Sequence, residues 1–150
     1  MSHITIPNSL FFEDVCRRIQ QKRGAKIRVQ GRSMEPFLKD GRDYIIVDAL
    51  PDGHRFRRGE LLLFVYGDRY IVHRVHRIKG DTLYMKGDHQ NHWEIIHEDD
   101  VRAWISCVEY ANGRRVHSMS RLWKILYLRS RIDRQRKNFH HFIKRMSGRE

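Results

Sequence analysis

Residues 69–88 read RYIVHRVHRIKGDTLYMKGD, two strand-like segments on either side of the dipeptide Gly80-Asp81. Gly-Asp is a strong turn signal, and a second turn, Lys86-Gly87-Asp88, closes the stretch. β-Branched and aromatic side chains, which are enriched in strands, recur on both sides of the first turn. The stretch therefore predicts two short strands joined by a tight turn.

The same pattern extends outward in both directions along the chain. Ile27 and Val29 alternate with polar residues, and further strands are predicted at 43–48, 60–66, 101–110 and 114–117. Asn112-Gly113 between the last two is a strong hairpin signal. Many short strands with closely spaced turns are typical of a coiled, barrel-like β domain. We therefore predict a mainly β fold, with this domain over residues 25–117.

Apolar residues at helical spacing flank the β domain on both sides. In residues 1–24, Leu10, Phe11, Val15 and Ile19 predict an N-terminal helix that packs on the body by one face. From Ser118 the pattern becomes helical again, which predicts one or two amphipathic helices in a basic C-terminal tail over residues 118–150.

The charge of the chain is concentrated in this tail. The 150 residues carry a net charge of +12, and residues 114–150 alone hold 12 Lys or Arg against two acids. Such a segment is expected to face an acidic partner. Cys16 and Cys107 lie far apart and are expected to be reduced core residues. The sequence shows neither a secretory signal nor a membrane-spanning segment, so we expect a cytoplasmic protein.

The ten histidines do not indicate a metal site. His89, His92, His97, His117, His140 and His141 fit neither a metalloprotease helix nor a zinc-finger spacing. We therefore expect no metal and no organic cofactor.

Three short motifs carry residues suited to catalysis. Ser33 lies in the turn 31–36, directly after a strand, where a nucleophile would be exposed and fixed; Gly31 would permit close approach and Pro36 would lock the backbone. His73 and His76 are three residues apart in a strand and should point to opposite faces, so that only one can serve a given site. Asp88 follows a strand, where it could orient an imidazole or cap a turn.

The order of these motifs resembles that of the signal peptidase and SOS-repressor self-cleavage superfamily, the S24/S26-like serine peptidases. The similarity covers residues 31–88, and the matching pieces are Gly31-Arg32-Ser33-Met34-Glu35-Pro36, Lys39-Asp40-Gly41-Arg42-Asp43, Arg58-Gly59-Glu60-Leu61-Leu62-Leu63-Phe64, Val72-His73-Arg74-Val75, Gly80-Asp81 and Lys86-Gly87-Asp88. Members share a strongly coiled β fold, which the resemblance implies here as well.

The resemblance also implies roles for individual residues. Ser33 would be the nucleophile, and His73 would be the base, because His73-Arg74-Val75 is similar to the histidine-type, endoplasmic-reticulum signal peptidases rather than to the lysine type. Asp88 would orient or charge the imidazole, with Asp81 as the alternative. Imidazole can accept and return a proton near neutral pH.

The turn around Ser33 would also supply the oxyanion site. The backbone N–H of Ser33 is the expected first donor, with Gly31, Met34 and Pro36 positioning it. Gly31 stands where some relatives have a serine side chain as second donor, and Arg32 stands where most have a small or acidic residue. The chain also lacks the transmembrane helices of the membrane-bound relatives and the N-terminal DNA-binding unit of the repressors.

We therefore predict a serine endopeptidase that cleaves a leader or precursor peptide through a Ser33–His73 dyad. The alternatives are a non-catalytic peptide-binding or regulatory module of the same fold, and a nucleic-acid-associated protein. Nucleic acid ranks lower because no recognised binding module is present. For residues 118–150 we expect either binding to an anionic membrane surface, which would place the protein at the inner membrane face, or packing on the body with a solvated basic face.

Overall fold

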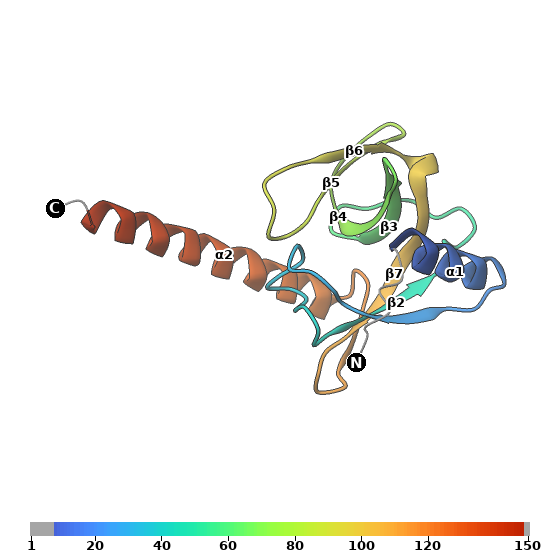
Figure 1. Ribbon diagram of the computed structural model, residues 1–150, viewed down its shortest axis with the longest axis horizontal. Helices are drawn as coiled ribbons and strands as arrows, with labels where there is room; N and C mark the ends of the chain where they lie inside the picture. The colour runs from blue at the N-terminus through green and yellow to red at the C-terminus, as the bar shows by residue number, and fades with distance from the viewer. Residues whose placement is uncertain (1–7, 149–150) are drawn as a thin grey trace.

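The computed structural model describes residues 8–148, which form two helices and eight strands (Figure 1). The elements are α1 (Asn8–Gln20), β1 (Ala25–Arg28), β2 (Tyr44–Asp48), β3 (Leu61–Tyr66), β4 (Arg69–Lys79), β5 (Thr82–Lys86), β6 (Glu94–His97), the 3-10 turn η1 (Glu98–Asp100), β7 (Val101–Glu109), β8 (Arg115–His117) and α2 (Arg121–Ser147). The predicted mainly β fold with an N-terminal and a C-terminal helix is confirmed. The patterns in the sequence did not predict β6.

All strands belong to one antiparallel sheet in the order β1-β2-β7-β3-β4-β5-β6, with β8 paired to β7. The central strand β7 pairs with β2 and β3 and so joins the two halves of the sheet. Register shifts occur at Ile46/Val47, Leu63/Phe64 and Val75/Arg77. Such bulges bend and twist strands, and Figure 1 shows β3 to β6 coiled around one another.

Two apolar clusters fill the sheet. The larger one lies under α1 and the start of α2, and the smaller one lies within the coil of β3 to β6. α1 contributes Phe12, Val15, Cys16 and Ile19, whereas Leu10 and Phe11 are exposed. The predicted docking face of this helix was therefore correct for Val15 and Ile19 and wrong for Leu10 and Phe11. Both cysteines are free thiols.

The basic segment after the sheet forms one helix. Ser120 caps α2, because its side-chain oxygen accepts a hydrogen bond from the backbone N–H of Trp123 at 3.2 Å. Trp123 is fully buried in the larger cluster, with its ring 5.0 Å from that of Phe37. Ile125, which has the helical spacing of a packing residue, is exposed. No helix of residues 8–148 is long and apolar enough to span a bilayer.

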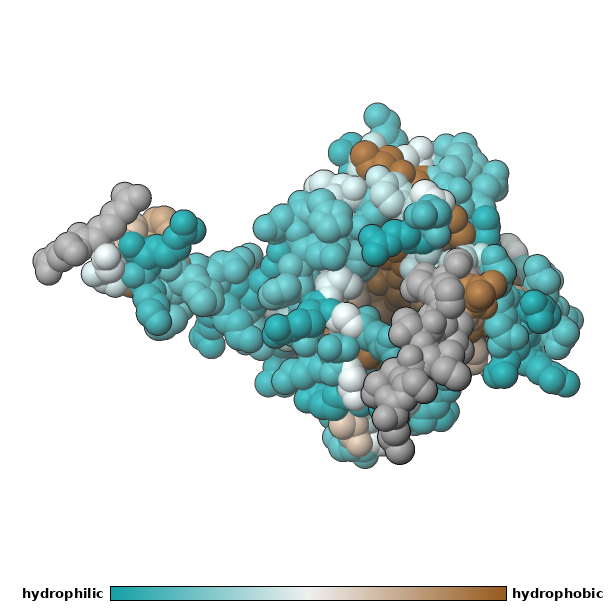
Figure 2. All heavy atoms as spheres, viewed as in Figure 1, coloured by the Kyte–Doolittle hydropathy of each residue, from teal (hydrophilic) through white to brown (hydrophobic). Residues whose placement is uncertain are grey.

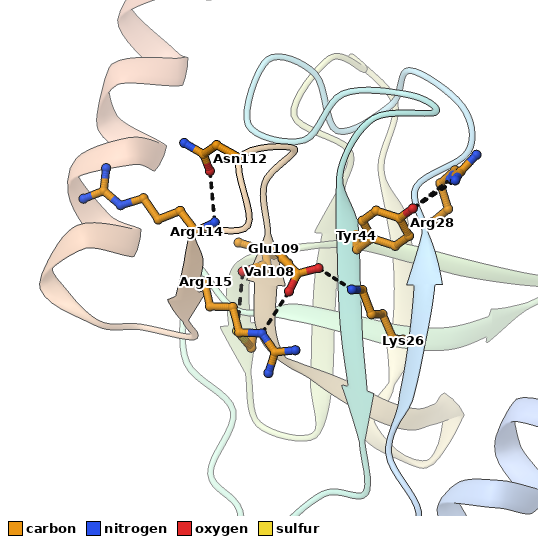
Figure 3. Close-up of polar contacts among 9 residues, drawn as sticks. Lys26, Arg28, Tyr44, Val108, Glu109, Asn112, Arg114 and Arg115 are labelled. Atoms are coloured by element: carbon orange, nitrogen blue, oxygen red, sulfur yellow. Dashed lines mark hydrogen bonds and ion pairs between the residues drawn. The ribbon is translucent and has the colours of Figure 1, made fainter.

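A polar network closes the other edge of the sheet (Figure 3). Glu109 on β7 accepts from Arg115 on β8 at 3.0 Å and pairs with Lys26 on β1, while Arg28 donates to the Tyr44 hydroxyl at 2.9 Å. These contacts join β1, β2, β7 and β8. The network therefore holds these strands together, including β1 and β2 on either side of the loop 29–43.

Candidate active site

Ser33 lies in the loop between β1 and β2 and is half-buried. The loop is held from both ends, because Gly31 N–H donates to Asp40 Oδ1 at 2.9 Å and Leu38 N–H donates to the Met34 carbonyl at 2.9 Å. The Met34 side chain is buried in the larger apolar cluster, so it anchors the residue next to the serine. A cis peptide bond precedes Pro36.

Gly31 has a different role from the predicted one. No atom lies within 4 Å of the position that a Cβ would take, so close approach does not require a glycine there. The backbone φ of +88° at this position is what requires a glycine, because residues with a Cβ rarely adopt that conformation.

The glycine at which chains do approach closely is Gly87. A Cβ placed on it would lie 2.9 Å from His73 Nε2 and 3.1 Å from Ser33 Cβ. Ser33 and His73 therefore both lie next to Gly87, although no hydrogen bond joins their side chains in the described residues. The segment after Gly87 also follows the serine loop, since His89 N–H donates to the Ser33 carbonyl at 2.8 Å.

The other ring nitrogen of His73 is bound to Glu94. Nδ1 lies 2.9 Å from Glu94 Oε2, and the two residues are only 4% and 2% exposed. In the tautomer of a neutral imidazole that donates from Nδ1 to this carboxylate, Nε2 is the acceptor and lies on the side of Gly87 and the Ser33 loop. The second carboxylate oxygen of Glu94 lies 3.2 Å from the exposed His92. His73 thus has Glu94 at one ring nitrogen and the Ser33 loop near the other.

The assignment of Asp88 to the imidazole was wrong. Both carboxylate oxygens of Asp88 accept from Arg74, at 2.8 Å each, and both residues are buried. Arg74 follows His73 in β4 and so points to the opposite face of that strand. There it also donates to the Gly59 carbonyl at 2.7 Å and stacks on Tyr127, with its guanidinium 3.9 Å from the ring centre. Asp88 is therefore part of the contact between the sheet and α2.

The alternative, Asp81, was wrong as well. It pairs with His97 Nε2 at 2.9 Å on the surface, in a turn away from His73. The hydrogen bond from His97 lowers the pKa of Asp81, and the same bond raises the pKa of His97.

His76 lies outside the Ser33 site, at the bulge where β4 shifts against β5. Its ring packs edge-on against Trp93, 5.5 Å away, and Nε2 has no hydrogen-bond partner within residues 8–148. Burial first, and then the neighbouring cation Lys86, lower its pKa to about 4. His76 is therefore neutral at physiological pH and faces away from the serine.

A cavity of about 500 Å³ lies between the sheet and α2. Its cations come from both parts: Arg58, Lys86, Lys124, Arg131 and Arg134. The one carboxylate in its lining is that of Asp88, which Arg74 already engages. The cavity is thus strongly positive. Within residues 8–148 no three His, Cys, Asp or Glu side chains are grouped as metal ligands would be.

Sequence reasoning missed Glu94 and the close approach at Gly87. A signal for Glu94 was present: in Glu94-Ile95-Ile96-His97, Glu94 shares a face with Ile96, and an acid on the apolar face of a strand needs a buried partner. Gly87 was visible only as part of a turn. Its contact with Ser33 joins residues that are distant in the sequence.

A family model confirms the resemblance. The model described as Peptidase S24-like matches residues 2–106, which include Ser33, His73 and Glu94 and stop before α2. No curated protein matches the chain. Because the match covers more than half of the chain and agrees with the coiled antiparallel sheet, the chain belongs to the Peptidase S24-like family.

Proposed function

We propose that the protein is a serine endopeptidase that hydrolyses a peptide bond in a leader or precursor peptide, with Ser33 as nucleophile, His73 as base and Glu94 as the group that orients His73. Members of the family are in general serine-type peptidases, and some of them are not catalytic. The observation that carries the proposal is the position of His73, with one ring nitrogen toward Ser33 and the other on a buried carboxylate.

The chemistry follows from that position. In this mechanism Nε2 accepts the proton of the Ser33 hydroxyl as Oγ attacks the substrate carbonyl. The imidazolium that forms is stabilised by the Glu94 carboxylate, and in a buried site this attraction is stronger than in water. Nε2 then gives the proton to the leaving amine. Water hydrolyses the acyl-enzyme by the same route.

The substrate class comes from the resemblance to signal peptidases. His73-Arg74-Val75 favours the histidine type of that superfamily. The basic protein surface is a less specific indication, and it suits a peptide with acidic side chains or a free carboxyl terminus. The backbone N–H of Ser33 is the proposed first oxyanion donor.

A serine-reactive probe tests the proposal directly. The wild-type protein should be labelled on Ser33, as read by peptide mass spectrometry, and both Ser33→Ala and His73→Ala should abolish labelling and peptide cleavage while the far-UV circular dichroism is unchanged. Ser147→Ala, at the far end of α2, is the matched control. Because the two residues act together, the double variant should be no worse than either single one.

Full cleavage by His73→Ala would show that the base is another residue. Absence of both labelling and cleavage in the wild-type protein, together with binding of peptides, would instead identify a non-catalytic peptide-binding module.

A further inference from the structure

α2 has one half that packs on the body and one half that does not. Trp123 is buried and donates to the Gly59 carbonyl at 3.1 Å, and Arg134 donates to the carbonyls of Asp88 and Gln90. Every residue from 135 to 148 is exposed. Figure 1 shows this second half as a rod that projects from the sheet. It is also outside the part of the chain that the family model matches.

The exposed apolar residues of α2 form a stripe on the side turned away from the body. The residues that contact the body include Trp123, Leu126 and Ser130, and an exposed apolar residue follows each of them by two positions. Two positions correspond to about 200° around a helix, so the second set faces the opposite way. The stripe continues along the projecting half at spacings of three, four or seven residues; its members are Ile125, Leu128, Ile132, Phe139, Phe142, Ile143 and Met146.

This stripe is large for a solvent-facing side. Phe139 is 65% exposed and Phe142 is 57% exposed, and both are aromatic. Figure 2 shows that the face of α2 turned to the viewer is mainly hydrophilic, with apolar residues only near its tip. The helix therefore has two groups of exposed apolar residues, in 125–132 and 139–146, on one side that the body leaves uncovered.

Cations border the stripe on both sides. α2 holds nine Lys or Arg and a single acid, Asp133. On the helical wheel, Arg129 and Arg136 lie along one border of the stripe, and Lys124 and Arg131 lie along the other. Within residues 8–148 none of these four forms an ion pair with a carboxylate. The basic cavity extends this positive region onto the body through Arg58 and Lys86.

We propose that α2 binds the protein to an anionic lipid bilayer, with the apolar stripe in the headgroup boundary and the bordering cations on lipid phosphates. A helix that lies in a membrane interface needs an apolar side with aromatic residues and a basic border, and α2 has both. The residues of α2 that pack on the body lie on the side of the helix opposite the stripe. The inference is independent of the proposed peptidase activity.

A second copy of the chain fits this surface less well. The stripe has the spacing of a coiled-coil seam, but the positions that border it are cations in both copies. Like charges would meet along such a dimer, whereas anionic headgroups neutralise them.

Vesicle flotation with the full chain tests the inference. Removal of residues 118–150 is unsuitable, because it would take Trp123 out of the core. Vesicles of phosphatidylcholine alone are compared with equal parts of phosphatidylcholine and phosphatidylglycerol. We expect binding to the anionic vesicles only, and a large loss of binding between about 0.1 M and about 1 M salt, where the screening length falls from ~10 Å to ~3 Å.

Two pairs of variants separate the apolar from the ionic contribution. F139S/F142S removes the aromatic residues of the stripe and should lower partitioning about tenfold or more, whereas H140S/H141S changes the adjacent exposed positions outside the stripe and should have little effect. R129Q/R136Q should weaken binding more than K137Q/K144Q, which removes the same charge from another side of the helix.

Equal binding to neutral and anionic vesicles, or unaltered binding by F139S/F142S, would overturn the inference. So would a monomer–dimer equilibrium, measured by light scattering, that F139S/F142S abolishes while vesicles are not bound. A monomer that binds neither kind of vesicle would equally refute it and would leave an acidic helical partner as the occupant of the stripe.

Discussion

Replacement of Asp88 by asparagine distinguishes a structural role of this residue from a catalytic one. Asp88→Asn keeps the shape of the side chain but removes the charge that balances Arg74, which is fully buried and bound through two hydrogen bonds of 2.8 Å. One amide oxygen can still accept, but the amide N–H₂ then faces the guanidinium. Loss of one partner of a buried pair typically costs about 3–5 kcal/mol. We therefore expect the free energy of unfolding to fall by about that amount.

Such a loss is large beside the ~5–15 kcal/mol by which a domain is stable. At about 2–4 °C for each kcal/mol, the melting temperature should fall by roughly 6–20 °C. The assay is urea unfolding followed by tryptophan fluorescence, with Asp81→Asn, which alters an exposed ion pair, as the control without a measurable shift. The double variant R74M/D88N should recover part of the loss, because it leaves no uncompensated charge among the rings of Phe37 and Tyr127.

An unchanged unfolding midpoint for Asp88→Asn, together with a loss of turnover as large as that of His73→Ala, would refute this reasoning. Asp88 would then act on the imidazole despite its contacts with Arg74.

Three further predictions concern Glu94, Gly87 and His76. Glu94→Gln should lower turnover by about 10²–10⁴-fold with little change in KM, because an amide N–H₂ beside Nδ1 favours the wrong tautomer of His73; retained turnover in a steady-state assay would remove Glu94 from the site. Gly87→Ala should impair turnover far more than the unfolding midpoint, since its Cβ would lie 2.7 Å from the Ser33 carbonyl oxygen and 2.9 Å from His73 Nε2, and equal activity of both proteins would contradict that geometry. His76→Gln should keep activity and should flatten the pH dependence of stability. The unfolded histidine, with a pKa of about 6.5, binds a proton that the folded histidine, with a pKa of about 4, does not, so the stability of the wild-type protein falls as the pH decreases from about 6.5 to about 4. An equal decrease of the urea midpoint from pH 7 to pH 5 in both proteins would count against this prediction.

The parts of the fold that follow from local patterns could be predicted from the sequence. Gly80-Asp81 and Asn112-Gly113 stand at observed turns because backbone geometry at a tight turn depends on the residues in it. Ser33 and His73 could be proposed because each lies in a short motif. The structure brings both residues next to Gly87, which belongs to a third segment.

Glu94 could not be assigned because its position depends on strand pairing. β6 is only four residues long, and Glu94 reaches His73 through the register of β6 on β5, in which Met85 is opposite Glu94. Such a register is a property of the assembled sheet. The misassignment of Asp88 had a different cause. Arg74, next to His73, needed a buried acid on the other face of β4, and this demand could have been foreseen from the alternation of strand side chains.

Arg134 connects the C-terminal helix to the segment that pairs with the Ser33 loop. Its guanidinium donates hydrogen bonds to the carbonyls of Asp88 and Gln90. The residue between these two, His89, donates its backbone N–H to the carbonyl of Ser33. A displacement of the projecting half of α2 would therefore reach the backbone of Ser33, the proposed nucleophile, through these hydrogen bonds. The contact of Arg134 with Asp88 lies one residue from Gly87. A partner that binds the projecting half of α2 would therefore also act on the position of the Ser33 loop.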